Sequence, residues 1–149
     1  MKTYETVREI LNRKGQVVWS IAPESTVYRA IEMMADKHVG ALLVMAGEKL
    51  AGIVSERDYA RKVILKGRSS KETHVRGIMT SPVVFVEPQH SVDDCMKIMT
   101  ESRIRHLPVL DHEKVVGIVS IGDVVNWIMS AQDHTIQQLQ NYVSGNYPP

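Results

Sequence analysis

Hydrophobic and polar residues follow one another in an order that occurs twice along the chain. Each copy opens with a segment rich in β-branched residues, Val17–Ile21 in the first copy and Val83–Val86 in the second. A proline, Pro23 or Pro88, follows each segment and cannot continue a central strand. This pattern predicts a short first strand in each copy.

The next segment of each copy has apolar residues at positions i, i+3, i+4 and i+7, the spacing of a helix with one buried face. The apolar positions are Val27, Ala30, Ile31 and Met34 in the first copy and Val92, Cys95, Met96 and Met99 in the second. Thr26 and Ser91 precede these positions, and hydroxyl side chains are favoured N-caps. We therefore expect a helix to begin after each of them.

A hairpin and a second helix complete each copy. Short apolar runs bounded by turn residues predict a buried strand, a tight loop and a returning strand. These strands are Ala41–Met45 and Leu50–Val54 in the first copy, and Leu107–Leu110 and Val115–Val119 in the second. The second helix is expected to open at Ser55 and at Ser120.

Shifting the chain by 65 residues aligns the two copies without a gap, with 13 identities in 44 pairs between residues 18–61 and 83–126. Each copy reads strand, helix, strand, strand, helix. One copy alone cannot cover both faces of a three-stranded sheet, whereas two packed copies can. The fold class predicted is α+β, with two βαββα motifs related by pseudo-two-fold symmetry.

The repeat defines the domain organisation. Residues 5–65 form the first motif with an N-terminal helix, 66–74 a polar linker, 75–130 the second motif, and 131–149 a C-terminal helix or tail. The lead-in Val7–Leu11 recurs as Val75–Met79, with three extra residues between the first lead-in and its motif. The apolar spacing of the tail fits either a helix covering the core or a docking face for a second chain.

Composition narrows the class of protein. Eighteen basic and 17 acidic side chains give a net charge of +1, which argues against a protein dedicated to binding polyanions. The longest apolar runs fall far short of the roughly 20 residues of a membrane span. A single cysteine and no export signal favour a reducing, cytoplasmic location. The six histidines lack metal-site spacing, so no metal is expected.

Ser-x-x-Asp occurs at the same place in both copies, where a strand becomes a helix: Ser55 with Asp58, and Ser120 with Asp123. One interpretation is a capping box. The other is a ligand site, because a carboxylate accepts hydrogen bonds from a ribose diol and a helix N-terminus favours a phosphate. The glycine three residues before each serine lets a ligand or backbone approach the strand.

Two βαββα copies that each end in Gly-Ile-Val-Ser-x-x-Asp resemble a tandem pair of CBS domains, the regulatory repeat named after cystathionine β-synthase. Leu107-Pro108-Val109-Leu110-Asp111 adds to the resemblance, which covers about residues 5 to 130. It implies a stand-alone CBS pair, or Bateman module, that binds AMP, ADP, ATP or NAD in clefts between the motifs. It also implies a homodimer that signals to an unidentified protein partner by conformational change.

The resemblance assigns site residues to both clefts. Asp58 and Asp123 hold ribose, supported by Ser55 and Ser120. Adenine is flanked by Ile53, Ile118 and the segments at Val17, Val18, Thr80, Val83 and Val84. On the phosphate side the second copy supplies Arg105 and His106, whereas the first supplies Arg57, followed by Arg61 and Lys62. The two sites are therefore expected to be unequal.

Two other function classes differ from this regulatory module. An enzyme is not expected, because the chain has no Gly-x-Ser-x-Gly motif, no phosphate-binding P-loop and no paired catalytic carboxylates. The alternative function is accessory binding of nucleic acid or of an acidic partner. It rests on residues 57–76, which carry seven basic and two acidic side chains.

Overall fold

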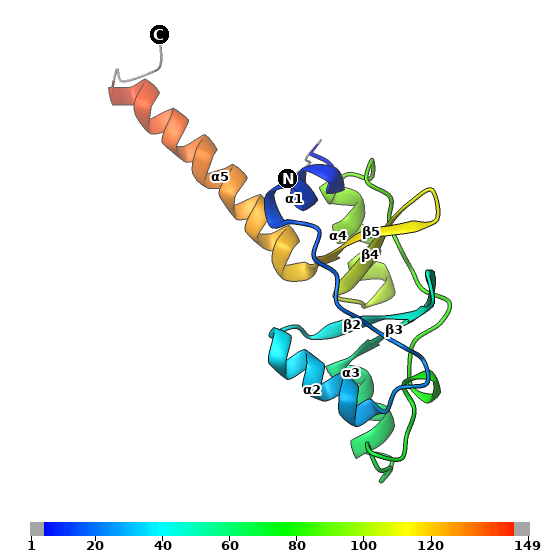
Figure 1. Ribbon diagram of the computed structural model, residues 1–149. Coiled ribbons are helices and arrows are strands. Elements are labelled where there is room, and N and C mark those ends of the chain that lie inside the picture. Colours follow the sequence, from blue (N-terminus) through cyan, green and yellow to red (C-terminus); the bar gives the residue numbers. More distant parts are fainter. Residues whose placement is uncertain (1–4, 145–149) are drawn as a thin grey trace.

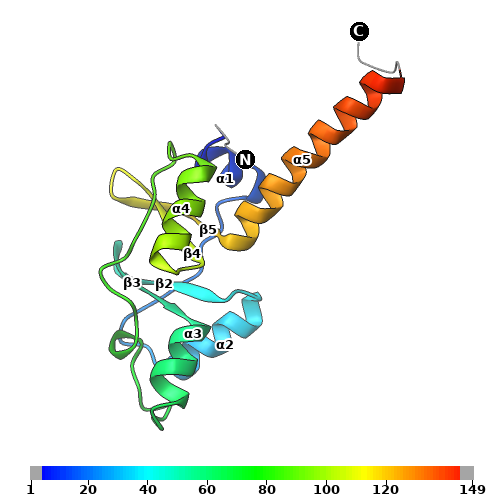
Figure 2. The ribbon, with the colours of Figure 1, turned by 180° about the vertical axis from the view of Figure 1, so that it is seen from behind.

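A computed structural model describes residues 5–144 as two packed halves and a long C-terminal helix (Figures 1 and 2). The first half contains β1 (Ser20–Ile21), α2 (Val27–Lys37), β2 (Ala41–Ala46), β3 (Lys49–Ser55), α3 (Glu56–Tyr59) and the π-helical turn η1 (Ala60–Ile64). The second contains the 3-10 turn η2 (Val75–Gly77), α4 (Val92–Ser102), β4 (His106–Asp111), β5 (Lys114–Ser120) and α5 (Ile121–Ser144). Helix α1 (Val7–Lys14) precedes both. The last residues of the predicted tail, 145–149, lie outside the described part.

The two halves repeat the same pairing. In the first, β1 lies parallel to β2, and β2 is antiparallel to β3. In the second, β4 is antiparallel to β5 in the equivalent register, and both hairpins have an irregularity at the same position. The predicted fold class, an α+β pair of βαββα motifs, is confirmed.

The first strand of each copy is shorter than predicted. Only Ser20 and Ile21 pair with β2, and in the second copy a single bridge joins Val86 to Val109. The preceding residues cross from one half of the molecule to the other, and Val17 and Val84 are exposed. Their β-branched composition therefore does not produce a longer strand, because no neighbouring strand lies beside them.

The helix starts agree with the sequence. The Thr26 hydroxyl accepts a hydrogen bond from the Arg29 N–H at 3.2 Å. Ser91 and Asp94 form a capping box, each side chain accepting from the other's backbone N–H at 3.0 Å. The bond from the Ser91 backbone is the main reason that the pKa of Asp94 lies below its ordinary value.

Each lead-in completes the core of the opposite half. The buried residues Val7, Ile10 and Leu11 of α1 pack with the core of the second half. Val75 and Ile78 pack with the core of the first half. Hydrophobic packing thus crosses the motif boundaries drawn from the sequence, so the two halves share one folded unit.

Helix α5 runs 24 residues from its start beside β5 and then projects away from the body (Figures 1 and 2). Val124 is buried in the second core, whereas Met129, Ile136 and Leu139 are more than half exposed. Its first turns therefore cover the core and the rest presents apolar side chains outward. None of the helices within residues 5–144 has the length and apolar character of a membrane span.

Candidate functional site

Both Ser-x-x-Asp motifs form capping boxes at a strand-to-helix junction. Asp58 Oδ2 accepts from the Ser55 N–H at 3.0 Å, and Ser55 Oγ accepts from the Asp58 N–H at 3.2 Å. The equivalent distances for Ser120 and Asp123 are 2.8 and 3.1 Å. The capping interpretation is confirmed, and it fixes both carboxylates in one orientation at the helix start.

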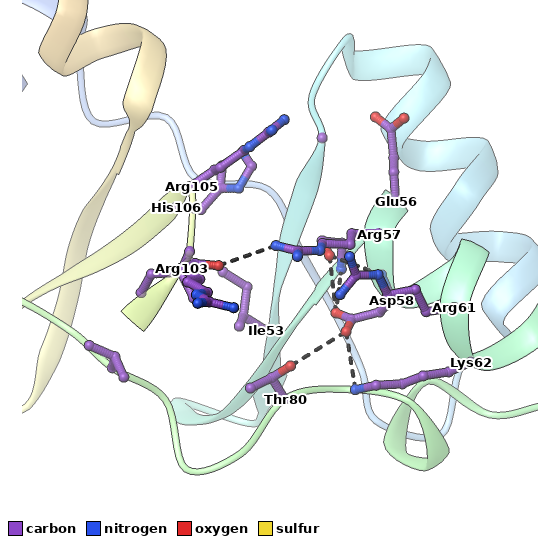
Figure 3. A pocket seen from close by; sticks show the side chains of 14 residues that line it. Ile53, Glu56, Arg57, Asp58, Arg61, Lys62, Thr80, Arg103, Arg105 and His106 are labelled. Carbon is purple, nitrogen blue, oxygen red and sulfur yellow. Dashed lines mark hydrogen bonds and ion pairs between the residues drawn. The ribbon is translucent and has the colours of Figure 1, made fainter. Parts of the chain in front are cut away.

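A cavity of about 860 Å³ lies between the halves, beside the first of these motifs. We call it the Asp58 cleft (Figure 3). The first half contributes Gly40, Ile53, Ser55, Glu56, Arg57, Asp58, Arg61 and Lys62 to its lining, and the second half contributes Thr80, Val84, Arg103, Ile104, Arg105 and His106. Because both halves line it, its shape depends on their relative orientation.

Asp58 lies at the centre of a polar network in this cleft. Its side chain is 13% exposed. Its Oδ1 atom lies 3.1 Å from Lys62 Nζ and accepts a long hydrogen bond of 3.5 Å from the Thr80 hydroxyl. Lys62 also donates to the Ile78 carbonyl at 2.8 Å. The carboxylate is thus partly shielded but remains open toward the cavity (Figure 3).

Cationic side chains from both halves converge on the Asp58 cleft. Arg57, Arg61 and Lys62 come from the first half, and Arg103 and Arg105 from the second. Arg57 Nη1 donates to the Arg103 carbonyl at 3.2 Å, which ties the two halves together across the cavity. The basic residues outnumber the acidic residues of the lining, so the cleft favours anions.

The placement of Arg105 and His106 differs from the sequence expectation. They were assigned to the phosphate side of the second copy, yet they line the cleft that holds Asp58. Arg103, Arg105 and His106 lie between the end of α4 and the start of β4, and they line the same cavity as Asp58 (Figure 3). That the two clefts bind ligands unequally stays a prediction.

The surroundings of His106 in this cleft shift the pKa of its imidazole. Burial lowers the pKa of its imidazole below the ordinary value of 6.5, and the charges of Lys14 and Arg105 lower it further. Asp123 opposes the shift. The ring is therefore neutral at pH 7, and of the two Ser-x-x-Asp carboxylates it is Asp123 that influences its charge.

Eight of the fourteen predicted site residues meet in the Asp58 cleft: Ile53, Ser55, Arg57, Asp58, Thr80, Val84, Arg105 and His106. Four lining residues were not predicted: Gly40, Glu56, Arg103 and Ile104. Arg103 is the repeat equivalent of His38, and both residues end a helix in the left-handed conformation, with φ of 54° and 55°.

The second motif has a different environment. Lys14 of α1 lies 2.5 Å from Asp123 Oδ2 and donates to the Ile118 carbonyl at 2.8 Å. A cavity of about 560 Å³ beside this pair extends along α1 and α5. The linings of the two cavities do not include five of the predicted residues: Val17, Val18, Val83, Ile118 and Ser120.

No group of three or more His, Cys, Asp or Glu side chains within residues 5–144 is arranged to hold a metal ion.

The repeat, the fold and the paired Ser-x-x-Asp motifs agree with a comparison against protein families. The profile of the CBS domain matches residues 7–65 and 75–130. The chain belongs to the CBS domain family. Both matches together span nearly all of the body of the molecule, and they make it a CBS pair.

Similar proteins support this membership. The chain is 41% identical over 152 residues to the CBS domain-containing protein CBSX3, mitochondrial, of Arabidopsis thaliana, covering 95% of this chain and 73% of that protein. A putative signal-transduction protein with CBS domains from Burkholderia ambifaria has a structure with a TM-score of 0.83 and 52% identity, covering 85% of this chain and 96% of that one.

A more distant structure shows the fold alone. The CBS domain pair of protein MJ0100, solved in complex with 5′-methylthioadenosine and S-adenosyl-L-methionine, has a TM-score of 0.76 and 22% identity. The similarity covers 87% of this chain and 99% of that one.

Proposed function

We propose that this CBS pair is a regulatory module that binds an adenine nucleotide, AMP, ADP, ATP or NAD, in the Asp58 cleft. The observation that carries the proposal is the convergence of the Asp58 carboxylate and five cationic side chains from both halves on one cavity. The adenosine-containing ligands of the MJ0100 CBS pair support the choice of ligand class.

The cavity suits a nucleotide in size and in chemistry. A volume of about 860 Å³ lies within the range of small-molecule sites. Ile53, Val84 and Ile104 offer apolar surface to a base, and the arginines offer bidentate donors to phosphate. The ribose hydroxyls would bind Asp58 by displacing its long contact with Thr80, the weakest of its hydrogen bonds at 3.5 Å.

Binding would change the relative orientation of the halves. A ligand that contacts Asp58 from one half and Arg105 from the other favours the orientation in which both contacts are made. This differential affinity is the physical basis for passing the bound state to a protein partner. The proposed role is therefore regulatory and not catalytic.

The basic segment 57–76 does not favour the alternative of nucleic acid or an acidic partner. Arg57, Arg61 and Lys62 line the cavity. Arg76 forms an ion pair of 2.8 Å with Glu24, and the Lys71 ammonium lies over the Tyr28 ring at 4.9 Å. The basic side chains of this segment thus make separate contacts. Three of them line the cavity in which we propose that the nucleotide binds.

Thermal unfolding and calorimetric titration with AMP, ADP, ATP and NAD test the proposal, with a guanine nucleotide and inorganic pyrophosphate as controls for the base and the charge. A ligand at about 100 times its Kd raises the free energy of unfolding by about 2.7 kcal/mol. We expect Asp58→Asn to remove most of this shift, with Asp36→Asn, an exposed carboxylate on α2, as the matched control. If none of the four nucleotides stabilises the wild-type chain, the proposal is wrong.

The remaining parts of the proposal concern assembly and location. We propose a homodimer, because exposed apolar residues follow each Ser-x-x-Asp sequence: Ile64 and Leu65 in the first copy, and Val125 and Met129 in the second. The proposed location is the cytoplasm, on the basis of the single cysteine, although the relative CBSX3 is named as mitochondrial.

A further inference from the structure

The carboxylates of the two motifs have different partners from the opposite lead-in. In the first motif, Thr80 pairs with Ile53 through two backbone hydrogen bonds, of 2.8 and 3.1 Å, and its hydroxyl donates to Asp58. In the second, the Lys14 ammonium alone donates to the Ile118 carbonyl and to Asp123. At the second Ser-x-x-Asp sequence, the charged side chain of Lys14 thus occupies the place that the backbone and hydroxyl donors of Thr80 have at the first.

The different lengths of the two lead-ins account for this replacement. Helix α1 runs eight residues to Lys14, whereas η2 has only three residues and is followed by the extended pairing at Thr80. The additional length carries Lys14 to the start of α5. The three extra residues between the first lead-in and its strand are the sequence feature that corresponds to this difference.

Lys14 is held in place by its surroundings. The buried side chains of Ile10 and Leu11 anchor α1 in the second core. Arg13, next to Lys14, lies over the Trp127 ring at 5.6 Å. The Lys14 side chain is 32% exposed and that of Asp123 is 21% exposed, so the ion pair is partly removed from water.

The Lys14 contact occupies the Asp123 carboxylate and the Ile118 carbonyl, the groups that a nucleoside would need at the second Ser-x-x-Asp sequence. Asp123 is the repeat equivalent of Asp58, the carboxylate proposed to bind ribose, and the ammonium of Lys14 already neutralises the charge of Asp123. The open space beside it runs along α1 and α5, lined by Arg13 and Trp127 among others. In the Asp58 cleft, by contrast, Ile53 and Ser55 themselves line the cavity.

We infer that Lys14 is the residue that makes the two clefts unequal in function: it closes the second cleft to ribose and limits each chain to one nucleotide, bound in the Asp58 cleft. This inference rests on the proposed function and restricts it. Lys62 also pairs with Asp58, at 3.1 Å, but the first cleft stays open beside this pair. Ile53 and Ser55 line the Asp58 cleft, whereas their repeat equivalents Ile118 and Ser120 do not line the cavity beside Asp123.

Calorimetric titration of the full chain tests the inference through the number of binding sites, with AMP, ADP, ATP and NAD as ligands. The wild-type chain is expected to bind one nucleotide. Lys14→Met keeps the aliphatic stem but removes the donors and the charge, and is expected to bind two. Adding Asp123→Asn to Lys14→Met is expected to return the number to one. Lys97→Met, an exposed lysine on α4, is the matched control and is expected to stay at one.

The outcomes separate this inference from the proposed function. Two sites in the wild-type chain, or one site in a folded Lys14→Met variant, would overturn the inference and leave nucleotide binding intact. No binding to the wild-type chain would overturn the proposed function itself. Lys14→Gln serves as a second variant if Lys14→Met does not fold, and the wild-type site number decides without any variant.

Discussion

Leu11 packs directly onto Gly117, although Leu11 belongs to the first copy of the repeat and Gly117 to the second. A Cβ atom built on Gly117 would lie 2.7 Å from Leu11 Cδ2. Met79, the repeat equivalent of Leu11, lies in the same way against Gly52, where a Cβ atom would be 2.7 Å from its sulfur. These glycines make room for the exchanged lead-ins, which settles their role in favour of protein contact.

Substituting alanine at these glycines is expected to destabilise the fold. Gly117→Ala overpacks against Leu11, which is buried and cannot move aside freely, so we expect a loss of about 1–3 kcal/mol. Urea unfolding measures the loss. In Gly117→Ala combined with Leu11→Ala the loss should be smaller than the sum of the single losses, because the clash is gone. Additive losses would contradict the contact.

Stability is expected to depend on pH through His106. Its pKa in the folded chain is lowered by burial, so the unfolded chain binds the proton first as the pH falls. The full contribution of the neutral ring is present above pH 6.5, the ordinary value, and is lost as the pH falls from there toward the folded pKa. The slope from this group is at most about 1.4 kcal/mol per pH unit. Urea unfolding at pH 7.5, 6.5 and 5.5 should show a shallower slope in His106→Gln, and equal slopes would contradict this.

The single cysteine should be unreactive in the folded chain. Cys95 is fully buried on the core face of α4, and burial raises the pKa of its thiol to about 11, with a further contribution from the charge of Asp94. The thiolate is the reactive form, and it is scarce at pH 8. Ellman's reagent should therefore label no thiol in native buffer and one per chain in urea. Rapid labelling of the native protein would show that α4 opens.

The proposed homodimer predicts a light-scattering mass of twice 16.8 kDa. Leu65→Glu and Met129→Glu each place a charge on an exposed apolar surface after one motif and are expected to shift the mass toward the monomer. Met96→Glu on α4 is the matched control, because Met96 is exposed but lies on another helix. A monomeric wild-type chain would refute the homodimer.

Local signals predicted much of this structure. Thr26 and Ser91 marked their helices because capping depends on residues only three positions apart. The β2–β3 and β4–β5 hairpins followed from short apolar runs and their turns. The first strands were overestimated, because propensity alone does not show whether a neighbouring strand is present at Val17 or Val83.

The site was predicted less completely, because it depends on which segments cross between the halves. Asp58 and Arg57 came from a motif with fixed spacing, but the position of Arg105 opposite them is a tertiary relationship. Lys14 lies outside the repeated lead-in and outside both Ser-x-x-Asp sequences, so nothing in the sequence pointed to it as a site residue. The three extra residues after the first lead-in were visible. Charge spacing along the chain cannot reveal a pair such as Lys14 and Asp123, which are distant in sequence and meet only after packing.

The exchange of lead-ins also affects the order of events during synthesis. Helix α1 leaves the ribosome about 100 residues before β5, the strand that carries the surface it covers. At roughly 5–20 residues per second, α1 waits on the order of 5–20 s with its apolar face uncovered. The second core therefore closes only after β5 and the first turn of α5 have been synthesised.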